Sequence, residues 1–257
     1  MSDDFSETEL ERYSRQLVLR EVGPEGQRRL RAAAVAVVGA GGLGSPALLY
    51  LAAAGVGRIT VIDDDRASLD NLQRQVLHDT ASVGEPKVHS ALRRLDALNP
   101  SVRVRAVERR LEAANAASLL RDHDLVLEGS DNFATKFAVN DACLALGITA
   151  VIAGILRFEG QVLVVPPAGP CYRCLFGGEP DPGLVPSCSA DGILGPVAGV
   201  VGSLQASEAL RALLGAGEPQ GGRLLVFEAL RPRLRAVEFE RDPACAACAS
   251  AVAAARR

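Results

Sequence analysis

The sequence predicts an α/β fold in which a doubly wound, mostly parallel sheet is extended by antiparallel strands. Short apolar runs alternate with stretches of helical periodicity from residue 34 to residue 154, which is typical of a parallel sheet covered by helices. A glycine-rich turn, GAGGLG at residues 39–44, follows the first apolar run and opens a helical stretch. After Gly154 the alternation stops, and strand patterns around one long helix replace it. These observations indicate a Rossmann-like sheet with an antiparallel extension.

The expected elements follow in order along the chain. Two helices come first, over residues 7–19, with Ser6 or Thr8 as the cap, and over 24–33. Buried strands are expected over 34–38, 58–62, 102–107, 124–129 and 148–154, separated by helices over 45–54, over 86–98 and over a segment that ends near Leu146. The second half has the patterns of a hairpin over 155–165, a long loop over 166–196, an amphipathic helix over 196–214 and paired strands over 223–229 and 233–239.

We expect a single domain over residues 1–257. It divides into N-terminal helices (1–33), a nucleotide-binding half (34–154) and a second half (155–257) that holds most of the cysteines. No internal repeat or low-complexity linker interrupts this order.

The composition excludes several classes of protein. A hydrophobic fraction of 48% with 23% charged residues is typical of a globular chain, and a net charge of −3 argues against a nucleic-acid binder. The N-terminus is polar and acidic, unlike a signal peptide. Residues 32–57 carry no charge, but glycines and a proline interrupt them, so a strand–turn–helix unit explains them better than a membrane span. We therefore expect a soluble cytoplasmic protein with reduced cysteines.

The glycine-rich turn predicts a nucleotide site. Its glycines allow the backbone to approach phosphate, and the following helix N-terminus offers unpaired N–H groups. The glycines expected to bind are Gly39, Gly41, Gly42 and Gly44. Asp63 and Asp65 lie about 20 residues further on, where such folds place the acid that holds a ribose. This pattern alone does not separate NAD from ATP.

The cluster NLQRQ, residues 71–75, helps to decide whether the site binds NAD or ATP. Arg74 has the chemistry of a bidentate phosphate clamp, and Lys87 at the start of the next helix supplies a second charge. Asp131 and Asn132 follow the fourth strand, and a carboxylate there suits Mg²⁺. Taken singly, Arg74 or Lys87 is more often a solvated surface charge. Together, two cations and an acid around one glycine-rich loop describe a triphosphate–magnesium site better than a dinucleotide site.

Two C-x-x-C pairs predict a zinc site. Cys171 and Cys174 form the first pair, and Cys245 and Cys248 form the second. Each pair can supply two thiolates to one tetrahedral Zn²⁺, and four thiolates leave no open position for substrate. The zinc would therefore be structural and would staple two distant segments. The alternative is two unrelated redox or incidental pairs.

The remaining cysteines and the histidines carry a weaker signal. Cys188 lies in the Gly/Pro-rich loop without a partner, so a thiol nucleophile and an inert loop cysteine are both open. Cys143 has the surroundings of a packed helix residue. The three histidines lie in no arrangement typical of a hydrolase, so no Ser–His triad is expected.

Eight motifs, in order from residue 12 to residue 248, resemble those of the MoeB/ThiF (HesA/MoeB/ThiF) family, the bacterial relatives of ubiquitin-activating enzymes. They are RYSRQ (12–16), VVGAGGLG (37–44), DNLQRQ (70–75), VGEPKV (83–88), GSDN (129–132), CYRC (171–174), GPVAGVVGSLQASEALR (195–211) and the final CAAC. The resemblance covers nearly the whole chain, and as a set the motifs are highly specific.

The resemblance implies an adenylyltransferase. Members of the family bind a small ubiquitin-like sulfur-carrier protein that ends in Gly-Gly, adenylate its C-terminal carboxylate with ATP and Mg²⁺, and release pyrophosphate. By matching position, Gly42 lies under the phosphates, Asp63 holds the ribose and Asp131 carries magnesium. Asn71, Arg74 and Lys87 contact the phosphates. Arg15, in RYSRQ, reaches across a homodimer into the partner's site, and the second half of the chain (155–257) binds the carrier and zinc.

Several alternatives stay open at this point. Molybdopterin biosynthesis is the first choice of pathway and thiamine biosynthesis the second, because the motifs serve both. In thiamine-pathway relatives a cysteine at the place of Cys188 acts in sulfur transfer. Longer members carry a sulfurtransferase domain; this chain ends at Arg257, so a separate sulfurtransferase or cysteine desulfurase is an expected partner. A nicotinamide-dependent oxidoreductase and a non-catalytic nucleotide-binding scaffold are the alternatives of a different class.

Overall fold

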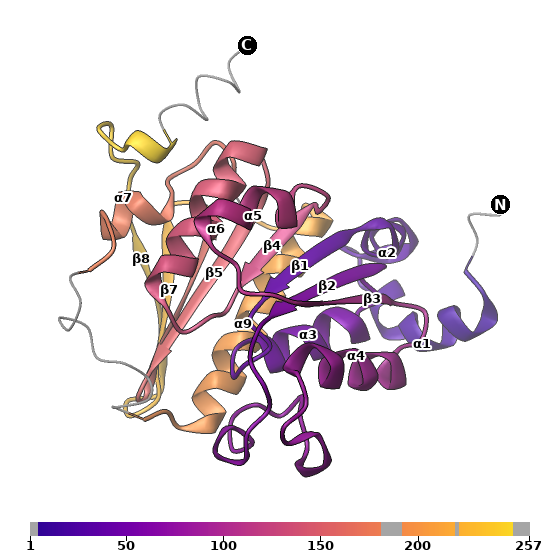
Figure 1. Cartoon of the computed structure of the whole chain (residues 1–257). Coiled ribbons are helices and arrows are strands. Elements are labelled where there is room, and N and C mark those ends of the chain that lie inside the picture. The colour runs from indigo at the N-terminus through magenta and orange to yellow at the C-terminus, as the bar shows by residue number, and fades with distance from the viewer. Residues whose placement is uncertain (1–4, 181–191, 219–220, 249–257) are drawn as a thin grey trace.

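The computed structural model describes residues 5–180, 192–218 and 221–248 (Figure 1). Its strands form one eight-stranded sheet in the order β3-β2-β1-β4-β5-β6-β7-β8. The first five strands in that order are parallel to their neighbours, and the last three pair antiparallel. The sheet therefore has the predicted doubly wound part and the predicted antiparallel extension.

The parallel part alternates strands with helices. Its strands are β1 (Ala34–Val38), β2 (Arg58–Asp63), β3 (Arg103–Glu108), β4 (Leu125–Glu128) and β5 (Thr149–Leu156). The helices before and between them are α1 (Glu7–Leu17), α2 (Gly23–Ala32), α3 (Gly44–Ala53), α4 (Lys87–Leu98), α5 (Ala113–Leu120) and α6 (Phe133–Leu146), with short 3-10 turns at η1 (Leu69–Asn71) and η2 (Thr80–Ser82).

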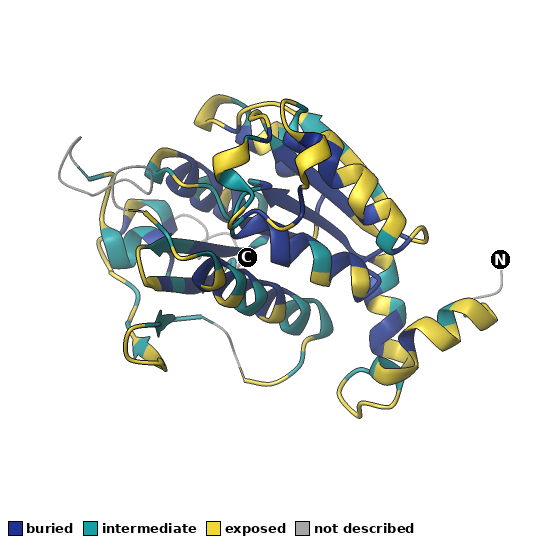
Figure 2. Ribbon diagram, turned by 90° about the horizontal axis from the view of Figure 1, so that it is seen from below, coloured by how far each residue is buried: buried dark blue, intermediate teal, exposed yellow. Residues whose placement is uncertain are grey.

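Two apolar layers bury both faces of the central strands. Val35 and Val37 of β1 pack in a cluster with α3, α4 and α9 (Gly195–Leu214), whereas Ala36 and Val38 pack on the other face with α5 and α6. Successive strand side chains point to opposite faces, so burial on both sides requires the continuous apolar run AVAVV. Figure 1 shows these helices on the two sides of the sheet, and Figure 2 shows the strands buried between them.

The antiparallel end begins at a hairpin. β5 pairs with β6 (Glu159–Val165) through a turn at residues 157–158, and β7 (Arg223–Glu228) and β8 (Arg233–Glu238) complete the edge. α9 packs across β4, β5 and β6 and thereby joins the parallel and antiparallel parts. The sheet is continuous through Gly154, because β5 itself crosses that position.

The structure differs from the prediction in two helices and several boundaries. α5 was not predicted; its Ala-rich sequence has a weak apolar pattern, but parallel strands β3 and β4 require a crossover. α7 (Tyr172–Phe176) lies within the expected loop. α4 begins at Lys87, with Pro86 as its N-cap rather than its first residue, and β5 continues two residues past Gly154. Among the described helices, none is long and apolar enough to cross a membrane.

Candidate active site

A cavity of about 450 Å³ opens at the carboxyl ends of the parallel strands. This is the expected place, because β1 lies between β2 and β4 and the strand order reverses there. The volume lies within the range of small-molecule sites, about 300–1,000 Å³. The cavity runs from the glycine-rich loop to the antiparallel strands, with a lining that includes Gly39, Gly41, Gly42, Asp63, Asp65, Arg74, Lys87, Asp131, Asn132, Gly154, Gln161 and Tyr172.

The glycine-rich loop turns sharply between β1 and α3. Gly39 has φ +91°, a conformation that side chains with a Cβ rarely adopt. A Cβ on Gly44 would lie 1.9 Å from the carbonyl oxygen of Gly39, so this glycine serves the close packing of the turn. Gly39, Gly41 and Gly42 line the cavity, but Gly44 does not. The loop therefore presents bare backbone and the N-terminus of α3 to a ligand.

The peptide at Ala40 is held from both sides. Asp63 accepts hydrogen bonds from the N–H groups of Ala40 (2.7 Å) and Asp65 (2.8 Å). Nε2 of buried His78 lies 2.8 Å from the carbonyl oxygen of Ala40, and its Nδ1 lies 3.0 Å from Oγ of Ser90. Burial raises the pKa of Asp63, although the charge of Lys87 and the two N–H groups oppose this. The predicted ribose acid thus also fixes the shape of the loop.

Arg74 is oriented by its own cluster. Its guanidinium donates to Oδ1 of Asn71 (3.0 Å) and to the carbonyl oxygen of Asp70 (3.1 Å). Gln75 donates to the same Asn71 oxygen at 2.7 Å. Asn71 does not line the cavity, whereas Arg74 and Gln75 do. The structure therefore places Asn71 behind Arg74 and Gln75, where it orients the guanidinium and the amide.

Lys87 is a buried cation with an exposed partner. Its Nζ donates to Oδ2 of Asp65 at 2.7 Å, and the side chains are 6% and 68% exposed, respectively. An ammonium that is nearly buried needs a compensating charge, and Asp65 supplies it. Because Asp65 faces solvent, an incoming phosphate can share the charge of Lys87 without an unpaired carboxylate remaining buried.

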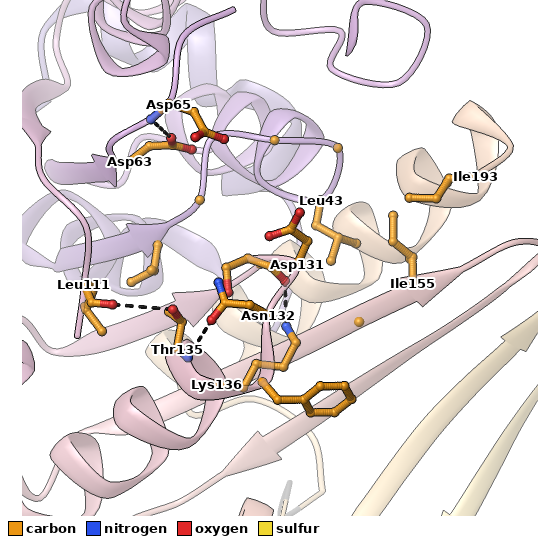
Figure 3. A pocket seen from close by; sticks show the side chains of 18 of the residues that line it. Leu43, Asp63, Asp65, Leu111, Asp131, Asn132, Thr135, Lys136, Ile155 and Ile193 are labelled. Carbon is orange, nitrogen blue, oxygen red and sulfur yellow. Dashed lines mark hydrogen bonds between the residues drawn. The ribbon is translucent and has the colours of Figure 1, made fainter. Parts of the chain in front are cut away.

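Asp131 sits at the start of a tightly held loop. Figure 3 shows its carboxylate in the cavity between the glycine-rich loop and β5. It has no hydrogen-bond or ion-pair partner among the described residues, and a free carboxylate facing a phosphate site suits Mg²⁺. The next residue, Asn132, caps α6 by accepting from the N–H of Thr135 at 2.8 Å. Beneath the loop, Lys136 pairs with the fully buried Glu128 at 2.5 Å.

One predicted residue, Arg15, lies away from the cavity of this chain. Arg15 is exposed on α1 and is not among the lining residues. Its predicted action across a homodimer stays a prediction. Cys188 lies outside the described residues, and Cys143 is buried in α6 as expected.

The four cysteines of the C-x-x-C pairs meet. The distances between Sγ atoms are 3.7 Å for Cys171–Cys174, 3.7 Å for Cys171–Cys245 and 3.5 Å for Cys174–Cys248. Four sulfurs at about 2.3 Å from a tetrahedral zinc would lie about 3.8 Å apart. Arg241 donates to Sγ of Cys248 at 3.3 Å, which favours a thiolate. The cluster therefore has the donor set and the spacing for a closed metal site, and it ties α7 to the C-terminal segment.

A family model described as the ThiF family matches residues 13–247. The chain belongs to the ThiF family. Its relatives in this family include the sulfur carrier protein adenylyltransferase of Thermus thermophilus, which is 52% identical over 95% of this chain and 92% of its own. The SAMP-activating enzyme E1 of Haloferax volcanii is 47% identical over 96% and 92% of the two chains. The adenylyltransferase and sulfurtransferase MOCS3 of Bos taurus is 49% identical, and the match covers 54% of its length.

Solved structures agree with the ThiF fold. Escherichia coli MccB with ATP superposes with a TM-score of 0.82 at 23% identity, over 95% of this chain and 75% of MccB. MccB with MccA-N7isoASN also gives 0.82, at 22% identity, over 92% and 74%. At these identities the likeness concerns the fold alone.

The sequence did not single out several residues of the ThiF site. His78 and Glu128 take their roles from contacts across the fold, and no local pattern marks them. Gln75 lies in the cluster NLQRQ, but the sequence analysis gave it no role of its own. Tyr172 lines the cavity although it belongs to the first C-x-x-C pair. The sequence did offer a clue to Lys136, because it is one of only two lysines in the chain. Both lysines line this cavity.

Proposed function

We propose that this chain activates a small sulfur-carrier protein by transferring AMP from ATP to the carrier's C-terminal Gly-Gly carboxylate. The relatives that are 46–52% identical are named as adenylyltransferases or as an activating enzyme, and this chain is an adenylyltransferase. The observation that carries the carrier assignment is the shape of the cavity. Its lining continues from the phosphate-binding loop to Gly154 and Gln161 on the antiparallel strands, and we infer that a narrow peptide tail lies there beside the nucleotide.

Different residues of the cavity serve different parts of the proposed AMP transfer. A carboxylate oxygen of the carrier forms a bond to the α-phosphorus, and the bond from that phosphorus to the bridging oxygen breaks, so pyrophosphate leaves. Arg74 and Lys87 face the cavity and stabilise the negative charge that grows on the leaving side. Asp63 fixes the loop, and we propose that it also accepts from a ribose hydroxyl. Each of these groups is already oriented by internal contacts, so little reorganisation is needed.

Asp131 is the proposed magnesium ligand. Its free carboxylate at the cavity and the surrounding cations fit a metal–triphosphate complex. Magnesium, when bound, would neutralise charge on the phosphates and orient them. Asp131 would hold the ion on the side of the glycine-rich loop, while Asn132 and the N-terminus of α6 keep the loop in place.

Zinc is the proposed metal of the cysteine cluster. Ligation by four sulfurs at tetrahedral spacing, with three of the four cysteines buried, fits a structural site. Such a site would hold Tyr172, which lies between Cys171 and Arg173 and lines the cavity.

Molybdopterin biosynthesis is the first pathway we propose and thiamine biosynthesis the second, with a cytoplasmic homodimer as the working unit. Sulfur would come from a separate sulfurtransferase or cysteine desulfurase. Reconstitution with each candidate carrier, followed by measurement of KM for the carrier, distinguishes the two pathways. The preferred carrier should have the lower KM, and a lower KM for the thiamine carrier would reverse the order.

The adenylation step is tested by exchange of labelled pyrophosphate into ATP in the presence of carrier. Arg74→Ala and Asp131→Ala should each lower this exchange about 10²–10³-fold, the usual loss for one preorganised electrostatic contact. Circular dichroism and the melting temperature should show that both variants still fold. Near-normal exchange in both variants would mean that the site has been assigned wrongly.

A further inference from the structure

The segment from Glu128 to Lys136 forms a closed network beneath the cavity. Oε1 of Glu128 accepts from the N–H of Ser130 at 2.8 Å, and Nζ of Lys136 donates to the carbonyl oxygen of Ser130 at 2.8 Å. Glu128 and Lys136 are paired at 2.5 Å. The ion pair therefore clamps both peptide groups of Ser130, the residue directly before Asp131.

Further bonds fix this network to the sheet. Lys136 donates its third hydrogen bond to the carbonyl oxygen of Ala153 at 2.6 Å, so all three N–H donors of the ammonium have a partner. Gln205 of α9 donates to the carbonyl oxygens of Glu128 and Val151, both at 2.8 Å. The clamp thus connects β4, β5, α6 and α9, and Figure 3 shows Lys136 directly under the Asp131–Asn132 loop.

A buried ion pair is a poor means of gaining stability. Glu128 is 0% and Lys136 6% exposed, so both charges have lost their hydration. Apolar residues of similar volume often stabilise a protein as well or better at such positions. A positional role explains the pair instead, because Asp131 has no described partner and its direction depends on the backbone before it.

We propose that Glu128 and Lys136 are a positioning pair that aims Asp131 at the magnesium–triphosphate complex. This inference rests on the proposed function, in which Asp131 is the magnesium ligand. Residues that orient a metal ligand through hydrogen bonds typically contribute about 10- to 100-fold to metal affinity or activity. The pair should therefore affect magnesium-dependent steps more than the fold.

The test compares single and double variants. Glu128→Gln and Lys136→Met should each lower the melting temperature, since each leaves one buried charge without its partner. The double variant Glu128→Gln/Lys136→Met should recover most of the melting temperature, because no unpaired charge remains. Its carrier-dependent pyrophosphate exchange should nevertheless stay about 10- to 100-fold below that of the wild type.

A second readout does not depend on turnover. Isothermal titration calorimetry gives the ATP affinity in the presence of magnesium and in the presence of EDTA. The ratio of the two affinities is called the magnesium gain. Asp131→Ala should remove this gain, and the double variant should lose most of it. A matched control is Glu208→Gln/Arg211→Met, which removes another ion pair, of 2.7 Å, on α9 outside the lining residues. The control should keep both the gain and the exchange rate.

The outcomes separate the two proposals. A wild-type chain without carrier-dependent exchange would contradict the proposed function. A double variant with wild-type stability, exchange and magnesium gain would overturn the positioning pair alone. If Asp131→Ala keeps the gain, both the magnesium assignment and the pair are wrong.

If the double variant does not fold, two single variants of Lys136 test the pair instead. Lys136→Arg keeps the charge and donors for Glu128 and Ser130, whereas Lys136→Gln loses the charge. Lys136→Arg should then retain more of the magnesium gain than Lys136→Gln. Equal losses in the two variants would overturn the pair.

Discussion

Replacing Asp63 by asparagine tests whether one carboxylate both shapes the glycine-rich loop and serves the nucleotide. The carboxylate accepts from the N–H groups of Ala40 and Asp65, one on each oxygen. Asparagine keeps the shape of the side chain and one of the two acceptors. Its NH₂ group would face the other N–H, so a buried donor would lose its partner.

The magnitude follows from these two bonds. A hydrogen bond to a charged group contributes about 1.5–3 kcal/mol, and an unsatisfied buried group costs about 1–3 kcal/mol. Burial raises the pKa of Asp63, which means that its ionised form is desolvated at a cost. Replacing it by a neutral amide removes this cost and offsets part of the loss. We expect Asp63→Asn to lower the free energy of unfolding by about 1–3 kcal/mol, or about 2–4 °C in Tm for each kcal/mol.

Urea denaturation and calorimetric titration with ATP are the assays. Asp64→Asn is the matched control for stability, because Asp64 is exposed and has no described hydrogen-bond or ion-pair partner. Asp63→Asn should unfold at a lower urea concentration than this control. It should also bind ATP more weakly than the wild type. Equal urea midpoints for the two variants would refute the structural role of Asp63, and an unchanged ATP affinity would refute its role toward the ribose.

Four further predictions concern metal, assembly, sulfur chemistry and pH. Metal analysis of freshly reduced protein should find about one zinc per chain, and Cys245→Ser should lose it and loosen the C-terminal strands; zinc-free protein with an intact fold would contradict this. Arg15→Ala and Asp131→Ala chains, each nearly inactive alone, should recover about a quarter of wild-type activity when mixed, because a heterodimer has one intact site; no recovery after verified subunit exchange would exclude an arginine supplied in trans. Cys188→Ala should leave pyrophosphate exchange nearly intact and affect only thiocarboxylate formation; a collapse of exchange would place Cys188 in the adenylation step. Burial lowers the pKa of His123 below its ordinary value, so the unfolded chain binds the proton first as pH falls below about 6.5, and His123→Gln should reduce this acid destabilisation by up to about 1.4 kcal/mol per pH unit; identical pH profiles of unfolding would contradict it.

The sequence predicted the parts of the site that local spacing determines. GAGGLG, the acids after β2 and the cluster NLQRQ are each read within a few residues, and the structure brings them to one sheet edge because parallel strands end there. The C-x-x-C pairs, 70 residues apart, were joined on chemistry alone, because two such pairs supply the four thiolates of one tetrahedral zinc site.

The rest of the site depends on tertiary contacts that no short pattern encodes. Glu128 looks like the polar end of a buried strand, and its partner Lys136 comes from the next helix. His78 supports Ala40 from 38 residues away, and Ser90 of α4 lies at its other ring nitrogen. Asn71 also orients Arg74, a contact that the sequence did not predict, and its contact with phosphate stays a prediction.

The most direct test of the central claim is to look for the product on the carrier. The purified chain is incubated with ATP, magnesium and a Gly-Gly-ending carrier, and intact-mass spectrometry follows the carrier while pyrophosphate is measured. The account predicts carrier that gains one AMP with release of one pyrophosphate, no gain on a carrier that lacks its terminal glycines, and no product with Arg74→Ala. Release of ADP and phosphate without any AMP on the carrier would contradict it.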